Sequence, residues 1–142
     1  MSLSALLNIN KISALKGGHE LEFAIKKVNS LDNSKDAPEK YLQAIITRVE
    51  KIIVREIKKY NPEDNFLCSK LGLETNNSDI TWYIKAISGE QNFIKGYPHF
   101  AVSVCSVKEE EVQTAFIFDP IRREEFLASK GKGSDLNNNK IR

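Results

Sequence analysis

The chain has 142 residues, of which 41% are hydrophobic and 28% are charged, and its formal net charge is +2. These values are typical of one soluble globular domain over residues 1–142, long enough to bury a core without disulfides. The small positive excess does not by itself indicate a nucleic-acid-binding protein, and no run approaches the ~20 apolar residues of a membrane span. Cys68 and Cys105 lack the spacing of metal ligands, so we expect reduced thiols in a cytoplasmic protein.

The first 61 residues of the chain predict helices in two segments. In residues 3–28 apolar side chains recur every three or four positions, but Gly17-Gly18 interrupts them. We therefore expect either one helix weakened at the glycines or two short helices. A second helix is predicted to begin after a cap at Asp36 and to end at Asn61-Pro62.

The remainder of the chain has the period-two alternation of strands. Polar and glycine-rich segments separate the runs, including a charged hairpin turn at residues 108–111. Because helices come first and meander strands follow, the sequence predicts an α+β fold, with two N-terminal helices packed on one face of an antiparallel meander sheet. The predicted strands cover residues 65–69, 80–86, 100–107, 112–118 and 125–129.

The segment Ile80–Phe100, ITWYIKAISGEQNFIKGYPHF, contains the most specific motif of the chain. It resembles the signature of the inositol monophosphatase family, roughly W-[IV]-[IV]-D-P-[IL]-D-G-T-x-N-F-x-x-x-x-P-x-[FV]. The stretches 6–18, 60–72, 92–104 and 117–142 are similar, in the same order, to the SuhB-like bacterial branch of that family. The positions that match the signature are Trp82, Ile84, Ile87, Gly89, Asn92, Phe93, Pro98 and Phe100.

The resemblance covers the first half of the family pattern and implies the corresponding half of the sugar-phosphatase fold. We therefore expect a shortened chain in which the second half of the family fold is absent. Members of the family hydrolyse small phosphomonoesters, typically inositol monophosphates, with Mg²⁺ ions that carboxylates hold. If the carboxylates of the family were all present in this chain, the resemblance would imply Mg²⁺-dependent hydrolysis of a phosphomonoester.

The family's carboxylate positions carry other residues in this chain. The Glu-Glu pair before Gly72 has become Ser69-Lys70, and an upstream aspartate position falls on Ile46, which the helical pattern predicts to be a core residue. In the signature, Lys85 and Ser88 replace two aspartates, and Glu90 replaces a threonine.

These substitutions reverse the charge of the expected site. At positions 69, 70, 85, 88 and 90 the family pattern has four carboxylates, whereas this chain has two lysines and one glutamate, a formal charge of +1. Mg²⁺ requires hard oxygen ligands, and an adjacent ammonium group repels it. We therefore expect no metal, no cofactor and no catalytic residues, and we consider Lys70 and Lys85 as candidate anion contacts.

The sequence predicts a catalytically inactive family member that works by binding. The SuhB-like branch is linked to transcription antitermination and ribosomal RNA maturation, so the resemblance implies complexes of that kind. The alternative is residual Mg²⁺-dependent phosphatase activity toward inositol monophosphate or a related phosphomonoester, and a third hypothesis is a gene remnant without a selected role.

Two kinds of partner are expected. A sheet without the cover of a second half would expose apolar residues, which predicts a homodimer or a bound protein. Basic residues crowd the C-terminal fifth and form either a solvated face, balanced by Glu124 and Glu125, or a patch that contacts the RNA backbone or an acidic protein. These basic residues are Arg122, Arg123, Lys130, Lys132, Lys140 and Arg142.

Overall fold

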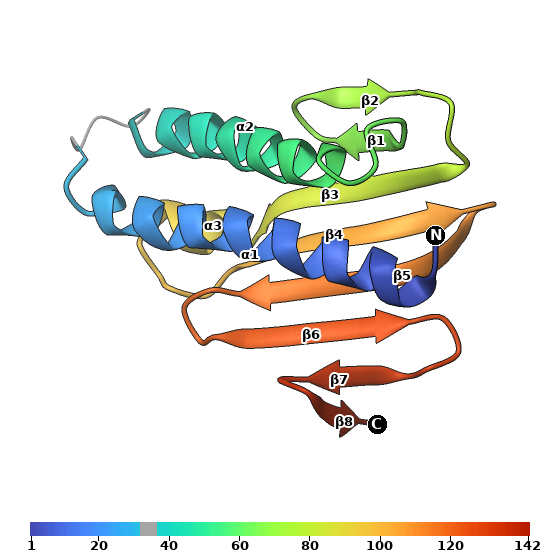
Figure 1. Cartoon of the computed structure of the whole chain (residues 1–142). Coiled ribbons are helices and arrows are strands. Elements are labelled where there is room, and N and C mark those ends of the chain that lie inside the picture. Colours follow the sequence, from blue (N-terminus) through green and yellow to red (C-terminus); the bar gives the residue numbers. More distant parts are fainter. Residues whose placement is uncertain (32–36) are drawn as a thin grey trace.

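The computed structural model describes residues 1–31 and 37–142, and two long helices open the chain (Figure 1). Helix α1 spans Leu3–Val28 and α2 spans Ala37–Lys58, and the two pack against each other. The side chain of Ser2 caps α1, because its hydroxyl oxygen accepts a hydrogen bond from the Ala5 amide at 3.1 Å. The predicted cap at Asp36 lies outside the described residues. In the described part of the chain, no helix combines the length and apolarity that crossing a membrane requires.

The strands form one eight-stranded sheet in the order β2-β1-β3-β4-β5-β6-β7-β8. Every neighbouring pair is antiparallel except β1 and β3, which run parallel. From β3 onward the sheet is a plain meander in which each strand pairs with the next one along the chain. The strands are β1 (Asn65–Cys68), β2 (Gly72–Glu74), β3 (Ile80–Ser88), β4 (Ala101–Lys108), β5 (Glu111–Asp119), β6 (Glu124–Ser129), β7 (Ser134–Leu136) and β8 (Asn139–Ile141).

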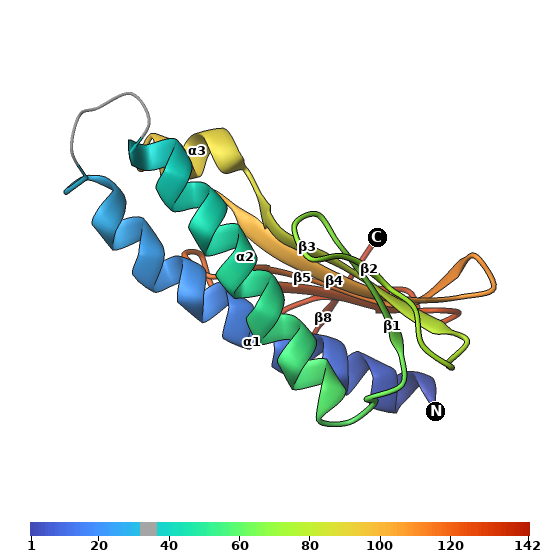
Figure 2. The same ribbon diagram turned by 90° about the horizontal axis from the view of Figure 1, so that it is seen from above.

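Both long helices cover the same face of this sheet (Figure 2). Helix α1 packs mainly on β5 and β4, and α2 packs on β3. The core lies between these layers, where Trp82, Val104 and Phe116 from the strands meet Leu42 and Ile53 from α2, all fully buried. A short helix, α3 (Glu90–Ile94), follows β3 and contacts the long helices. The opposite face of the sheet has no helical cover within the described residues.

The glycine pair of α1 allows the close contact of that helix with the rest of the core. A methyl group on Gly18 would overlap the ring of Phe118, and one on Gly17 would lie 2.9 Å from Cδ1 of Ile53. Both positions are buried, so the missing side chains make room for neighbouring residues. The helix is therefore continuous through Gly17-Gly18, because tertiary packing offsets their poor helix propensity.

A buried polar chain fixes α1 against the sheet. Asn10 is fully buried, and its Nδ2 donates to the carbonyl oxygen of Val104 at 2.6 Å. Thr114 donates from Oγ1 to Oδ1 of Asn10 at 2.6 Å, and the hydroxyls of Thr114 and Ser106 are hydrogen-bonded to each other. Because each of these buried polar side chains has a partner, the chain stabilises one register of α1 on β4 and β5.

A carboxylate on α2 joins the two long helices. Nζ of Lys16 on α1 and Nζ of Lys59 each lie 2.7 Å from Oε1 of Glu56. The hydrogen bonds from Lys16 and then from Lys59 hold the pKa of Glu56 below its ordinary value.

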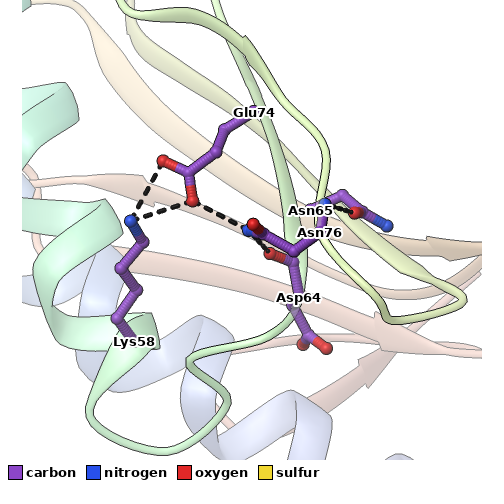
Figure 3. A network of polar contacts seen from close by, with 5 residues as sticks. All are labelled: Lys58, Asp64, Asn65, Glu74 and Asn76. Atoms are coloured by element: carbon purple, nitrogen blue, oxygen red, sulfur yellow. Dashed lines mark hydrogen bonds and ion pairs between the residues drawn. The ribbon is translucent and has the colours of Figure 1, made fainter.

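A second polar network fixes the loop that leads into β3 (Figure 3). Nζ of Lys58 lies 2.9 Å from Oε2 of Glu74, and the same carboxylate oxygen accepts from Nδ2 of Asn76 at 2.8 Å. Nδ2 of Asn76 also donates to the Asp64 carbonyl, while Oδ1 of Asn65 accepts from the Asn76 main chain. The network therefore joins the end of α2 to the residue before β1, at Asp64, and to the end of β2, at Glu74.

The predicted fold class is confirmed, and the structure corrects several details. The first helix is unbroken, and α2 ends at Lys58, three residues before Asn61. The sheet is not purely antiparallel, because the loop after β2 returns the chain beside β1 in the parallel direction. The sequence also missed α3 and the three-residue strands β2, β7 and β8.

Candidate functional site

Four of the six positions that the sequence predicts to be substituted line one pocket of about 580 Å³, namely Ile46, Ser69, Lys85 and Glu90. They come from α2, the turn after β1, β3 and the start of α3, so the fold brings together residues that are far apart in the sequence. The rest of the lining is mainly apolar and belongs to the central strands. It consists of Leu67, Cys68, Tyr83, Ile84, Ala86, Ile87, Ser103, Val104, Cys105, Ala115, Phe116 and Ile117.

Ser69 and Lys70 lie in the turn between β1 and β2, which a buried carboxylate on α2 holds. Glu50 is fully buried, and its Oε2 accepts from the Ser69 hydroxyl at 2.8 Å. Its Oε1 accepts from the main-chain amides of Lys70 at 3.0 Å and Leu71 at 2.9 Å. The two amide donors of this turn are therefore already bound to the protein's own carboxylate. The Lys70 side chain is exposed and is not part of the pocket lining.

Lys85 and Ser88 are separated by an irregularity in β3. The pairing of β3 with β4 shifts register between these two residues, and the intervening Ala86 and Ile87 are both buried. Lys85 consequently faces the uncovered side of the sheet beside Ser103. Ser88 instead lines a neighbouring pocket of about 420 Å³, which also contains polar groups of His99, Asp119 and Arg122.

The short helix that carries Glu90 depends on a glycine. Gly89 has φ of 101°, and a methyl group there would lie 2.9 Å from the His99 carbonyl oxygen. Only glycine adopts this backbone conformation and tolerates this contact without strain. The signature glycine therefore places Glu90 at the rim of the pocket, directly after the Lys85 strand.

Neither cysteine has the lowered pKa of a reactive or metal-binding thiol. Burial, with a smaller contribution from the Glu50 and Glu74 carboxylates, raises the pKa of Cys68 to about 12. Burial also raises the pKa of Cys105. Both are therefore thiols at neutral pH, whereas nucleophilic attack and metal binding require the thiolate. Across residues 1–31 and 37–142, no three His, Cys, Asp or Glu side chains form a group that could hold a metal ion.

Most of the C-terminal basic residues have acidic neighbours. Four of the six form ion pairs, whereas Lys132 and Arg142 form none with the residues that the structure describes. Such pairs lower the positive potential that a nucleic-acid backbone would meet. The four pairs are Arg122–Glu124 at 3.8 Å, Arg123–Glu22 at 2.8 Å, Lys130–Glu111 at 3.0 Å and Lys140–Asp135 at 3.1 Å.

Glu50 is the residue of this region that the sequence reasoning missed. It lies four residues after Ile46, and three and seven residues before Ile53 and Ile57, so it occupies the apolar stripe of α2. A single acidic residue within such a stripe indicates a buried carboxylate with partners, and that signal could have identified it.

Comparison with known proteins identifies the family of this chain. The sequence profile of the Inositol monophosphatase family matches residues 2–142. The chain belongs to this family. It is 36% identical over 136 residues to the Nus factor SuhB of Xylella fastidiosa, covering 96% of this chain and 49% of that protein. It is 33% identical to the Inositol-1-monophosphatase of Rhizobium meliloti, covering 100% of this chain and 54% of that protein.

A solved structure has the same arrangement. The extragenic suppressor protein suhB from Bartonella henselae superimposes with a TM-score of 0.84 and 28% identity, over 97% of this chain and 53% of that one. The chain thus spans about half the length of the relatives it matches. The family assignment and the half-length match both agree with the resemblance found in the sequence.

Proposed function

We propose that this chain is a catalytically inactive member of the inositol monophosphatase family that acts by binding. The setting proposed is a cytoplasmic complex for transcription antitermination or ribosomal RNA maturation, since several relatives are Nus factor SuhB proteins. The observation that carries the proposal is the composition of the pocket at the family signature. Its charged side chains are Lys85 and Glu90, and its remaining lining is mainly apolar.

The residues of this pocket do not fit Mg²⁺. Magnesium prefers octahedral coordination by oxygen ligands, usually with more than one anionic group from protein or substrate. Among the residues that the structure describes, Glu90 is the only carboxylate in the lining, and the Ser69 hydroxyl is already hydrogen-bonded to Glu50. A lysine ammonium 4 Å from even a single positive charge costs about 4 kcal/mol at an effective dielectric near 20. This donor set supports a pocket without the family's metals.

The test is a phosphate-release assay with inositol monophosphate in the presence of Mg²⁺, with and without EDTA. A full-length relative, the Inositol-1-monophosphatase of Rhizobium meliloti, serves as the positive control. We expect no EDTA-sensitive release from this chain. Turnover that EDTA abolishes would support the second candidate, a residual Mg²⁺-dependent phosphatase, which the 33% identity to that relative favours.

The nature of the partner is part of the proposal. A protein partner is favoured by the uncovered sheet face, and contact with RNA would use the C-terminal basic residues. Because four of these are paired with acids, we expect weak RNA binding that depends mainly on Lys132 and Arg142. Fluorescence anisotropy with a labelled single-stranded RNA measures this, and the Lys132→Glu/Arg142→Glu variant should reduce both the affinity and its salt dependence. Equal affinity in the parent and this variant would exclude an RNA contact at these residues.

A further inference from the structure

The outward surface of α2 carries basic side chains and almost no acidic ones. Two of the three glutamates of this helix are buried: Glu50 binds the β1–β2 turn, and Glu56 binds two lysines. The third, Glu39, lies in the first turn. From Arg48 to the end of the helix, the exposed charged side chains are therefore all cationic.

Three of these cations, Arg48, Lys51 and Arg55, lie on one face of α2. They are spaced by three and four residues, and like charges at this spacing destabilise a helix. Glu20 of α1 accepts from Nη1 of Arg48 at 2.7 Å, which leaves the other N–H groups of that guanidinium available. Lys51 and Arg55 form no ion pair with the residues that the structure describes. This face of α2 therefore has a positive charge that the described part of the chain does not compensate.

The three cations line a groove of about 440 Å³, which we call the α2 groove. Its other lining residues are Ala44, Thr47 and Ile52, so the cations surround small and uncharged side chains. All six residues belong to α2 and recur every three or four positions, so the groove follows the helix axis. It lies on the helical side of the molecule (Figure 2) and shares no lining residue with the pocket at the family signature.

We propose that the α2 groove binds an acidic helix of a partner protein. Carboxylates that are three, four and seven residues apart on a helix are separated along its axis by about 4.5, 6 and 10.5 Å. Arg48, Lys51 and Arg55 have the same spacing, so a helix that lies beside α2 can place one carboxylate near each cation. Ala44 and Thr47 are small enough for the two helices to approach to the usual distance of about 8–10 Å between their axes.

Nucleic acid fits this groove less well than an acidic helix. Among the residues that the structure describes, the groove has no aromatic side chain on which a base could stack. Three cations, one of them already paired with Glu20, would neutralise few phosphates, and the affinity for a nucleic-acid backbone depends on that number. An amphipathic helix would in addition gain apolar contacts with Ala44 and Ile52.

Binding at the α2 groove alone should be weak. The six lining residues offer a contact well below the area of stable protein interfaces. Exposed ion pairs each contribute little free energy, and salt screens them. We therefore expect a transient complex that is tighter at low than at high ionic strength.

The test is nuclear magnetic resonance of the ¹⁵N-labelled full chain, titrated with an acidic helical peptide at low salt. The peptide is alanine-based and about 20 residues long, so that it is helical in water, with glutamates spaced alternately by four and three residues along one face. We expect the backbone amide shifts to change mainly in residues 44–55, and added salt to reverse the changes. The same peptide with glutamines in place of the glutamates should cause no such changes.

A charge-neutralising variant tests whether the groove itself carries the binding. Lys51→Gln/Arg55→Gln should weaken peptide binding at least about fivefold. The matched control is Lys95→Gln/Lys108→Gln, because these lysines are exposed, lie outside α2 and lower the net charge equally. This control should bind the peptide as the parent does, and circular dichroism verifies that both variants are folded.

Three results would overturn the inference. The first is a chain whose amide shifts do not change at millimolar peptide. The second is equal weakening in the variant and its control, because the attraction would then be to the overall charge and not to the groove. The third is a labelled single-stranded RNA that displaces the peptide and shifts the same amides at lower concentration, because nucleic acid would then be the occupant.

The inference rests on the proposed binding function, for which it names the chemistry of one partner, yet the two can fail separately. Turnover that EDTA abolishes would refute the inactive enzyme without touching the α2 groove. A failed peptide titration would refute the acidic helix and leave the phosphatase result unchanged.

Discussion

Replacing Glu50 with alanine tests the hydrogen bonds that hold the β1–β2 turn. The variant removes one buried carboxylate and leaves three donors without their acceptor: the Ser69 hydroxyl and the amides of Lys70 and Leu71. Each hydrogen bond to a charged acceptor contributes about 1.5–3 kcal/mol. Water can reach part of the turn, so we expect a total loss of about 3 kcal/mol in the free energy of unfolding rather than the full sum. Glu50→Gln keeps one acceptor oxygen, and its loss should be about half as large.

Urea unfolding followed by circular dichroism measures this loss, and native-state hydrogen exchange locates it. The Lys70 and Leu71 amides should lose protection in Glu50→Ala, while amides of β4 keep theirs relative to global unfolding. Glu39→Ala is the matched control, because Glu39 is an exposed glutamate of the same helix, and its loss should stay within about 0.5 kcal/mol. If Glu50→Ala matched this control, the assignment of the buried carboxylate as the clamp of the turn would be wrong.

Three further predictions concern packing and ionisation. Gly18→Ala should lower the free energy of unfolding by about 1–3 kcal/mol, because the new methyl group overlaps Phe118 and this outweighs the better helix propensity of alanine. Gly17→Ala should lower it less. Equal urea midpoints for the Gly18→Ala variant and the unmodified chain would contradict this. Because the pKa of Glu56 is lowered, its contribution to stability is present above its unfolded pKa near 4.5 and is lost as the pH falls further, so Glu56→Gln should flatten the stability profile below that pH. Cys68, with its pKa raised to about 12, should not react with iodoacetamide at pH 8 until urea unfolds the chain, and rapid native labelling would refute this.

The architecture could be predicted because its signals are local. The apolar stripe of α2 and the alternation in β3–β6 specify both the element type and the buried face. The parallel pairing of β1 with β3 could not be predicted, because it depends on how the loop after β2 returns and not on the strand residues themselves. Helix α3 was missed because five residues carry no periodic signal, although Gly89 marked its start.

The candidate site was predicted in part, because sequence motifs identify its residues but not the strand pairing that orients them. The family pattern identified Ile46, Ser69, Lys85 and Glu90, and the structure brings them to one pocket. It did not indicate that Ser88 would turn toward a neighbouring pocket, because a register shift in β3 redirects that residue. The role proposed for these positions stays a prediction until the phosphatase assay is done.

The clamp at Glu50 also bears on which sequences this turn can accept. The carboxylate accepts hydrogen bonds from the main-chain amides of residues 70 and 71 and not from their side chains. These two bonds therefore depend on the path of the main chain only. The side chains at those two positions are thus free to vary in size and charge without deforming the turn, with proline as the exception because it lacks an N–H. The lysine at position 70 therefore leaves the path of the turn unchanged, because its main-chain amide still donates to Glu50. The path of this turn and the chemistry of its side chains can therefore change independently of each other.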